Sequence, residues 1–119
     1  MASNLIYISG PISDDPDYFA KFAAVEDYLT QRGCPVLNPA RMFDGIAKAG
    51  AGYGQIMNLC LALVRQADCI ALLPDWKHSP GANAELEAYF HRRNLPRVLS
   101  FALVRDNRSG RWVVQPTHE

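Results

Sequence analysis

Residues 68–85 read DCIALLPDWKHSPGANAE, and this stretch decides the fold class. Its first six residues form the most apolar short run of the chain, which predicts a strand buried on both faces, as in a parallel sheet covered by helices. After a polar loop, Ser79-Pro80 is expected to begin a helix that runs to about Arg93, because serine is a good N-cap and proline fits the first helical position. This order of strand, loop and helix is typical of an α/β protein.

The same alternation continues on both sides of this stretch. Further strands are predicted at residues 5–8, 34–37, 98–104 and 112–114, and further helices at about 19–33 and 53–66. Residues 41–54 hold four glycines among alanines and are expected to form a flexible loop over the site. The pattern predicts a three-layer α/β/α sandwich with a parallel sheet of flavodoxin-like or Rossmann-like order and a short C-terminal edge strand.

Length and composition favour one compact domain over residues 1–119, with 49% hydrophobic and 20% charged residues. The 12 basic and 12 acidic side chains cancel, so neither a nucleic acid polymer nor an anionic membrane is an expected partner. The three cysteines form no CxxC pair and the three histidines share no metal-ligand spacing, so we expect neither a disulfide nor a metal site. No signal peptide or membrane span is expected at the N-terminus, and the expected location is cytoplasmic.

Three unusual segments follow three of the predicted strands. They are Ser9-Gly10-Pro11, Asn38-Pro39 and residues 74–81. Ligands of parallel α/β sheets bind at the carboxyl ends of the strands, where the strand order reverses. We therefore expect the functional site at this edge, with the small residues after Ser79 leaving backbone N–H groups open to an anion.

Glu85 is the leading candidate for chemistry, because Gly81 and Ala82 leave space in front of it. The alternative is a solvated glutamate favoured by the helix dipole, which is how we interpret Glu87. Tyr7 either points its hydroxyl at the site or belongs to the core. Trp76 either forms a pocket wall that stacks on a base or covers the end of the sheet.

Residues 7–12 and 68–85 together resemble a family of small phage and bacterial proteins, the domain of unknown function DUF4406. That family is similar in turn to the nucleoside 2-deoxyribosyltransferases and the 2'-deoxynucleoside 5'-monophosphate N-glycosidases. The resemblance extends to about residue 95. It implies N-glycosidic bond hydrolysis or transfer on a nucleoside or deoxynucleotide, with no cofactor and with a homodimer or larger assembly completing the pocket.

Site roles follow from the resemblance residue by residue. Glu85 would attack C1' of the sugar to give a covalent glycosyl-enzyme, and Tyr7 would orient it. Ser79 would touch a 5'-phosphate, which leans towards a nucleotide, while Ser9 and Gly10 would belong to the loop around the same phosphate. The remaining expected substrate-binding residues are Gly81, Asp75 and Trp76.

One departure from the enzyme pattern concerns Cys60. The enzymes carry an aspartate that protonates or holds the leaving base eight residues before the position of Asp68, and this chain has a cysteine there. A thiol is a poor general acid, although solvent or Asp75 could assist the leaving base. This departure motivates a second hypothesis, a non-catalytic nucleotide-binding module using the same pocket. A third, a nucleoside-monophosphate phosphoribohydrolase of the cytokinin-activating type, would need a longer glycine-rich run before the glutamate.

Overall fold

The computed structural model describes residues 4–91 and 95–115. Its centre is a four-stranded parallel sheet in the order β2-β1-β3-β4. The strands are β1 (Ile6–Ser9), β2 (Val36–Leu37), β3 (Cys69–Leu72) and β4 (Val98–Ser100). The order reverses between β1 and β3, so the chain has the predicted flavodoxin-like order.

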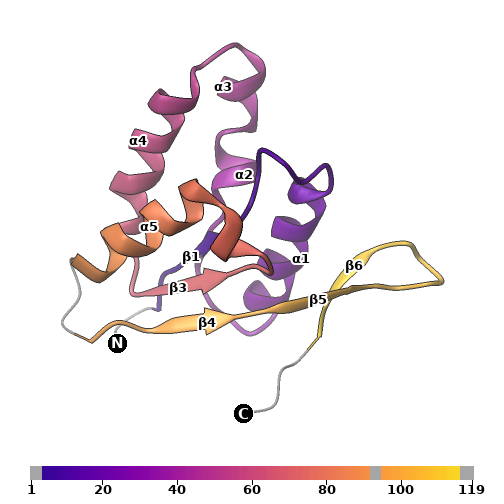
Figure 1. The fold of residues 1–119 in the computed structure, drawn as a ribbon. Helices are drawn as coiled ribbons and strands as arrows, with labels where there is room; N and C mark the ends of the chain where they lie inside the picture. The colour runs from indigo at the N-terminus through magenta and orange to yellow at the C-terminus, as the bar shows by residue number, and fades with distance from the viewer. Residues whose placement is uncertain (1–3, 92–94, 116–119) are drawn as a thin grey trace.

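Helices cover both faces of the sheet, which confirms the three-layer α/β/α sandwich (Figure 1). Helix α1 (Tyr18–Thr30) packs on one face, while α4 (Tyr53–Val64) and α5 (Pro80–His91) pack on the other. The two central strands, β1 and β3, are buried along their whole length. That burial on both faces is what their continuous apolar residues predict.

Alternation along β1 divides its side chains between two cores. Ile6 and Ile8 pack with α1 in the first core, whereas Tyr7 packs with α4 and α5 in the second. Successive side chains of a strand point to opposite faces, so Ser9 lies on the same face as Tyr7. This periodicity brings the polar groups of β1 to the side of the sheet where α5 lies.

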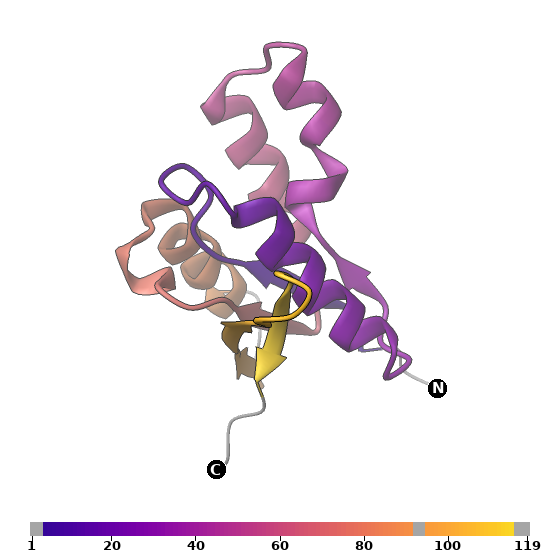
Figure 2. The ribbon, with the colours of Figure 1, turned by 90° about the vertical axis from the view of Figure 1, so that its right-hand side faces the viewer.

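The expectation of a flexible loop at residues 41–54 is wrong. This segment contains the end of α2 (Pro39–Met42), all of α3 (Asp44–Lys48) and the beginning of α4. Asn38 caps α2 by accepting a hydrogen bond from the Arg41 amide, and Lys48 pairs with Asp44 one turn earlier in α3. Among the four glycines of this segment, only Gly50 has a backbone conformation that favours glycine, with φ of +103°. Figure 2 shows α3 and α4 rising together beyond the sheet.

The prediction of one strand over residues 98–104 is also wrong, whereas the predicted short strand at 112–114 is present but lies outside the parallel sheet. Strand β4 ends at Ser100, and β5 (Ala102–Arg105) pairs with β6 (Trp112–Gln115) in a separate antiparallel hairpin. Leu103 and Val114 pack against the first core, so the hairpin covers α1 instead of extending the sheet (Figure 1). An apolar run predicts extended backbone but does not identify its pairing partner.

Helix boundaries differ from the predictions by a few residues. Helix α1 ends at Thr30, and Gly33 follows with φ of +80°. The predicted end of α5 at Arg93 and the frayed tail after Pro116 lie outside the described residues. Across residues 4–91 and 95–115, none of the helices combines the length and the apolar character that a membrane crossing requires.

Candidate functional site

Glu85 lies near the middle of α5 and is only 7% exposed, which excludes the solvated alternative. Both of its carboxylate oxygens accept hydrogen bonds from β1. Tyr7 Oη donates to Oε2 at 2.7 Å, and Ser9 Oγ donates to Oε1 at 2.6 Å. The side chain is therefore held at a fixed position by two hydroxyls that come from one strand.

Strand periodicity explains why Tyr7 and Ser9 act together. They are two residues apart on β1, so both point to the face on which α5 packs. Both side chains are fully buried. A buried hydroxyl requires a hydrogen-bond partner, and the Glu85 carboxylate provides one for each.

Burial governs the ionisation of this cluster. It raises the pKa of Glu85 above its ordinary value, against the opposing effect of hydrogen bonds from Ser9, Tyr7 and the Cys60 thiol. Burial also raises the pKa of Tyr7, and the neighbouring Glu85 carboxylate raises it further. Tyr7 is therefore a hydrogen-bond donor and not a phenolate.

Cys60 is the third partner of the carboxylate. It lies on the buried face of α4, 5% exposed, close enough to Glu85 and Tyr7 to influence their pKa values. Burial raises the pKa of the Cys60 thiol to about 11, so the thiol is neutral at physiological pH. Cys60 therefore lies beside the candidate nucleophile at the wall of the same cavity, although the sequence alone indicates only a small hydrophobic residue on the apolar stripe of the helix.

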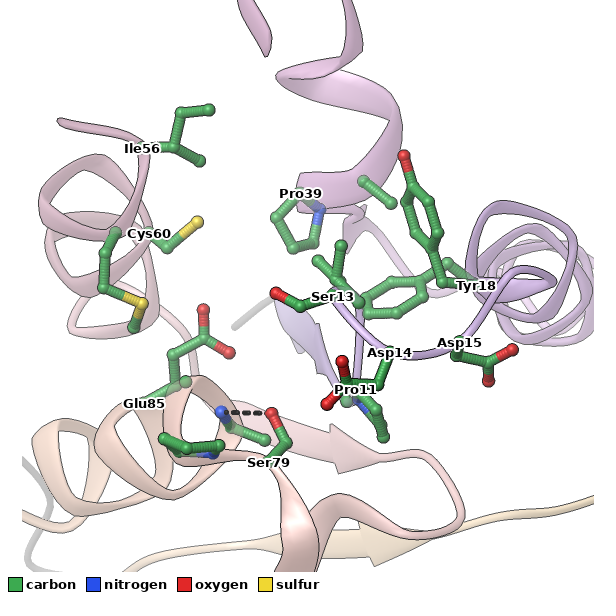
Figure 3. Close-up of a pocket in the computed structure, with 18 of the residues that line it drawn as sticks. Pro11, Ser13, Asp14, Asp15, Tyr18, Pro39, Ile56, Cys60, Ser79 and Glu85 are labelled. Atoms are coloured by element: carbon green, nitrogen blue, oxygen red, sulfur yellow. Dashed lines mark hydrogen bonds between the residues drawn. The ribbon is translucent and has the colours of Figure 1, made fainter. Parts of the chain in front are cut away.

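A cavity of about 660 Å³ lies in front of Glu85, at the carboxyl edge of the sheet. This volume is typical of a small-molecule site. All three segments expected at this edge contribute to its wall, through Gly10 and Pro11, Pro39, and residues between Asp75 and Gly81. Figure 3 shows the Glu85 carboxylate pointing from α5 into the space between Cys60 on α4 and Ser13 on the loop after β1.

Ser79 caps α5 as expected. Its hydroxyl accepts a hydrogen bond from the Ala82 amide at 3.1 Å, and its carbonyl accepts one from the Asn83 amide (Figure 3). Two of the first amides of α5 are thus bonded to Ser79, and Pro80 has no N–H group. Within this helix start, the Gly81 amide is the one left for an approaching anion, which is fewer than the sequence suggested.

The two glycines of the site have different roles. A Cβ on Gly10 would lie 2.7 Å from Leu73 Cβ, so glycine is needed for the chain to pass β3. A Cβ on Gly81 would lie 3.2 Å from Tyr53 Oη and 3.6 Å from Met57 Sδ, beside the cavity. Gly81 therefore widens the cavity, in line with the space expected in front of Glu85.

Asp75 and Trp76 are neighbours in the loop after β3 but lie in different surroundings. Asp75 lines the cavity and adopts a left-handed backbone with φ of 65°. Trp76 begins the short 3₁₀ helix η1 (Trp76–His78), is not among the residues that line the cavity, and packs with the second core. The structure thus places Trp76 over the end of the sheet, the second of the two interpretations given above.

Several cavity residues were not identified from the sequence as site residues. They are Asp14, Asp15, Lys21, Asp44, Tyr53, Met57 and His78. Two of the segments that hold them were recognised only as a polar loop and as a glycine-rich stretch over the site. Which of their side chains face the cavity depends on α3 and α4, whose packing the sequence does not reveal.

No group of three or more histidine, cysteine or acidic side chains within the described parts of the chain is arranged to hold a metal ion. Strand order, layers and the cavity at the switch point define the class: an α/β sandwich with a cavity at the carboxyl edge of its parallel sheet. The family model described as "Domain of unknown function (DUF4406)" matches residues 4–94, and the chain belongs to this family. No curated protein and no solved structure matches the chain.

Proposed function

We propose that this protein cleaves the N-glycosidic bond of a nucleoside or deoxynucleotide, with Glu85 as the nucleophile. The observation that carries the proposal is the arrangement of Glu85 itself. It is a nearly buried carboxylate, bonded through both oxygens and facing a cavity large enough for a nucleoside. Such a carboxylate is suited to stabilise oxocarbenium character and then to bond to the anomeric carbon.

In the proposed reaction an oxygen of Glu85 attacks C1' while the C1'–N bond breaks, and the bonding electron pair leaves with the base. Water or a second base then attacks C1', which regenerates the carboxylate and gives hydrolysis or transfer respectively. Tyr7 and Ser9 act as positioning residues, because their hydroxyls hold the two oxygens. Gly10, Asp75, Ser79 and Gly81 line the substrate cavity.

The proposal includes a relationship to the nucleoside 2-deoxyribosyltransferases and the deoxynucleotide N-glycosidases. It rests on the residues that match, namely Tyr7, Ser79 and Glu85, which the fold brings to one edge of the sheet. A phage-related, cytoplasmic homodimer or larger assembly is part of the same proposal. Trp76 has no role in it, since its ring belongs to the second core.

A second candidate function is binding without cleavage. Two observations favour it: the partner of Glu85 on α4 is a neutral thiol, and burial raises the pKa of Glu85, which favours the protonated carboxyl that is not a nucleophile. In this case the cavity would hold an intact nucleotide. A ligand that binds only the folded state raises the free energy of unfolding by RT ln(1 + [L]/Kd), and so raises the melting temperature as its concentration increases.

One experiment separates the two functions. The protein is incubated with deoxynucleosides and their 5'-monophosphates, free base is measured, and the melting temperature is recorded with each compound. Cleavage predicts base release that is lost in Glu85→Gln and retained in Glu87→Gln, an exposed glutamate on the same helix. Stabilisation by a compound that stays intact supports binding, and no release from any compound contradicts cleavage.

A further inference from the structure

The charge of the cavity carries an inference about its substrate, and this inference rests on the proposed function. Carboxylates outnumber ammonium groups strongly among the lining residues. The acidic residues are Asp14, Asp15, Asp44, Asp75 and Glu85, and the basic ones are Lys21 and His78. A cavity lined by one sign of charge concentrates ligands of the opposite sign.

The lysines near the cavity are occupied. Lys21 Nζ lies 2.8 Å from Asp15 Oδ2 and 4.6 Å from the centre of the Trp112 ring. Lys48 Nζ lies 3.0 Å from Asp44 Oδ2. Each lysine thus neutralises one carboxylate and is held by it, which leaves little positive charge for a phosphate.

Two further carboxylates line the cavity and have no lysine partner among the described residues. Asp14 and Asp75 are exposed at the cavity wall, and neither forms an ion pair within residues 4–91 and 95–115. Together with Glu85 they give the cavity a net negative charge. A ligand with a positive charge would be attracted there, and a dianionic phosphate would be repelled.

Within the described part of the chain, the lack of a strong acid beside Glu85 to protonate the leaving base also favours a positively charged substrate. The base of an ordinary nucleoside is neutral and leaves as an anion unless an acid protonates it. The side chains hydrogen-bonded to Glu85 are the hydroxyls of Tyr7 and Ser9, and the thiol of Cys60 lies nearby; all three are weak acids. Asp15 is paired with Lys21, whose hydrogen bond and charge lower the pKa of the Asp15 carboxyl and favour its ionised form.

We propose that the substrate is an N-glycoside whose base carries a fixed positive charge at the glycosidic ring, such as a pyridinium or N-alkylpurinium nucleoside. When Glu85 attacks C1', the electron pair of the C1'–N bond neutralises the cationic ring, so the base leaves neutral and needs no proton. Water then hydrolyses the glycosyl ester of Glu85, and one proton passes to solvent. The bound cation also favours the ionised form of Glu85, which burial opposes.

The test compares pairs of nucleosides that differ in charge and little in shape. They are oxidised against reduced nicotinamide riboside and N7-methylguanosine against guanosine, each also as the 2'-deoxy sugar. We expect release of the base from the cationic member to be at least ~100-fold faster, since general acid catalysis contributes about this factor or more and the weak acids beside Glu85 supply it poorly to the neutral member. Release should be lost in Glu85→Gln.

Two sets of variants exclude the intrinsic reactivity of the cation as the explanation. Replacing Asp14 and Asp75 by asparagine should raise KM for the cationic nucleoside about fivefold relative to KM for the neutral one. Cys60→Asp, which places an acid beside Glu85, should accelerate only the neutral nucleoside, with Cys60→Asn as the isosteric control without an acid. An unchanged KM in the first variant would overturn the role of charge.

The outcomes separate this inference from the proposed function. If neutral nucleosides are cleaved as fast as cationic ones and the reaction depends on Glu85, the proposed function stands and the cationic substrate is wrong. If neither kind releases its base, both are wrong. A preference for 5'-monophosphates over the corresponding nucleosides would also contradict the inference.

Discussion

The Tyr7 hydroxyl donates a 2.7 Å hydrogen bond to Oε2 of Glu85, which joins residues 78 positions apart in the sequence. Ser9 holds the other oxygen from the same strand at 2.6 Å. The first strand of the sheet thereby fixes a carboxylate on the last helix of the sandwich. These two hydrogen bonds between β1 and α5 hold the Glu85 carboxylate in a fixed position at the wall of the cavity.

Tyr7→Phe tests the positioning role. The variant keeps the buried ring and loses the hydroxyl, so Glu85 loses one of its two hydrogen bonds to β1. A hydrogen bond to a charged group contributes about 1.5–3 kcal/mol, which predicts a fall in kcat of about 10-fold to 100-fold with a smaller change in KM. The acidic limb of the pH profile should move to higher pH, because that hydrogen bond lowers the pKa of Glu85.

Tyr89→Phe is the matched control for this variant. Tyr89 is equally buried, and its hydroxyl bonds the backbone of Asp68 and Arg97, away from the cavity. We expect the control to lose stability and to keep the kcat and the pH profile of the wild type. Equal losses of kcat in Tyr7→Phe and Tyr89→Phe would show that Tyr7 has only a structural role.

The pH dependence of stability should report the burial of Glu85. Because the pKa of Glu85 in the folded protein lies above its ordinary value of 4.5, the folded state binds the proton more tightly than the unfolded state. The stabilisation is complete below 4.5 and is lost as pH rises through the folded pKa. Urea unfolding of wild type and Glu85→Gln across pH should therefore show the variant gaining relative stability from about pH 4.5 upwards.

The exposed Glu87 provides the control for that series, since Glu87→Gln should follow the wild-type curve. A difference between Glu85→Gln and wild type that stays constant across the pH range would contradict the raised pKa. A loss of stability of Glu85→Gln relative to wild type with rising pH would show that the pKa is lowered in the fold.

Gly10→Ala tests the close approach of the chain to β3. The added methyl group would lie 2.7 Å from Leu73 Cβ, so one of the two segments must shift. We expect a loss of about 1–3 kcal/mol in the free energy of unfolding, measured by urea titration. Gly45→Ala, in α3 with nothing within 4 Å of the added carbon, should be neutral or stabilising; equal effects of the two changes would refute the packing constraint.

The sequence predicted the layers and the strand order because both depend on local patterns. Continuous apolar residues at 68–73 indicate a doubly buried strand, and the β–α alternation restricts the crossover geometry. The hairpin of β5 and β6 was assigned to the wrong sheet, since the packing of Leu103 and Val114 on the first core is a tertiary choice. The four glycines of residues 41–54 favour a loop, but the cap at Asn38 and the Asp44–Lys48 pair stabilise helices in this segment.

The candidate site was predicted in outline and not in its charges. Glu85 is buried because α5 packs over β1, and the alternation of β1 gives it Tyr7 and Ser9 as partners. The resemblance implies Tyr7 as the partner of Glu85 but places Ser9 at a phosphate, whereas in the structure Ser9 is buried, bonds Glu85 and is not part of the cavity lining. The proximity of Cys60 to Glu85 appears only in the folded structure. The acidic residues that line the cavity come from segments distant in sequence, so no local sequence pattern predicts that they lie together.

The most direct test of the central claim is to trap the glycosyl-enzyme. The protein is mixed with a nucleoside that it cleaves, in a form whose sugar carries fluorine beside C1' to slow the second step, and is quenched in acid, digested and mapped by mass spectrometry. We predict that the peptide containing Glu85 gains the mass of one glycosyl group in the wild type and in Glu87→Gln, and does not in Glu85→Gln. Base release by Glu85→Gln at the wild-type rate, or an adduct on another residue, would contradict the account.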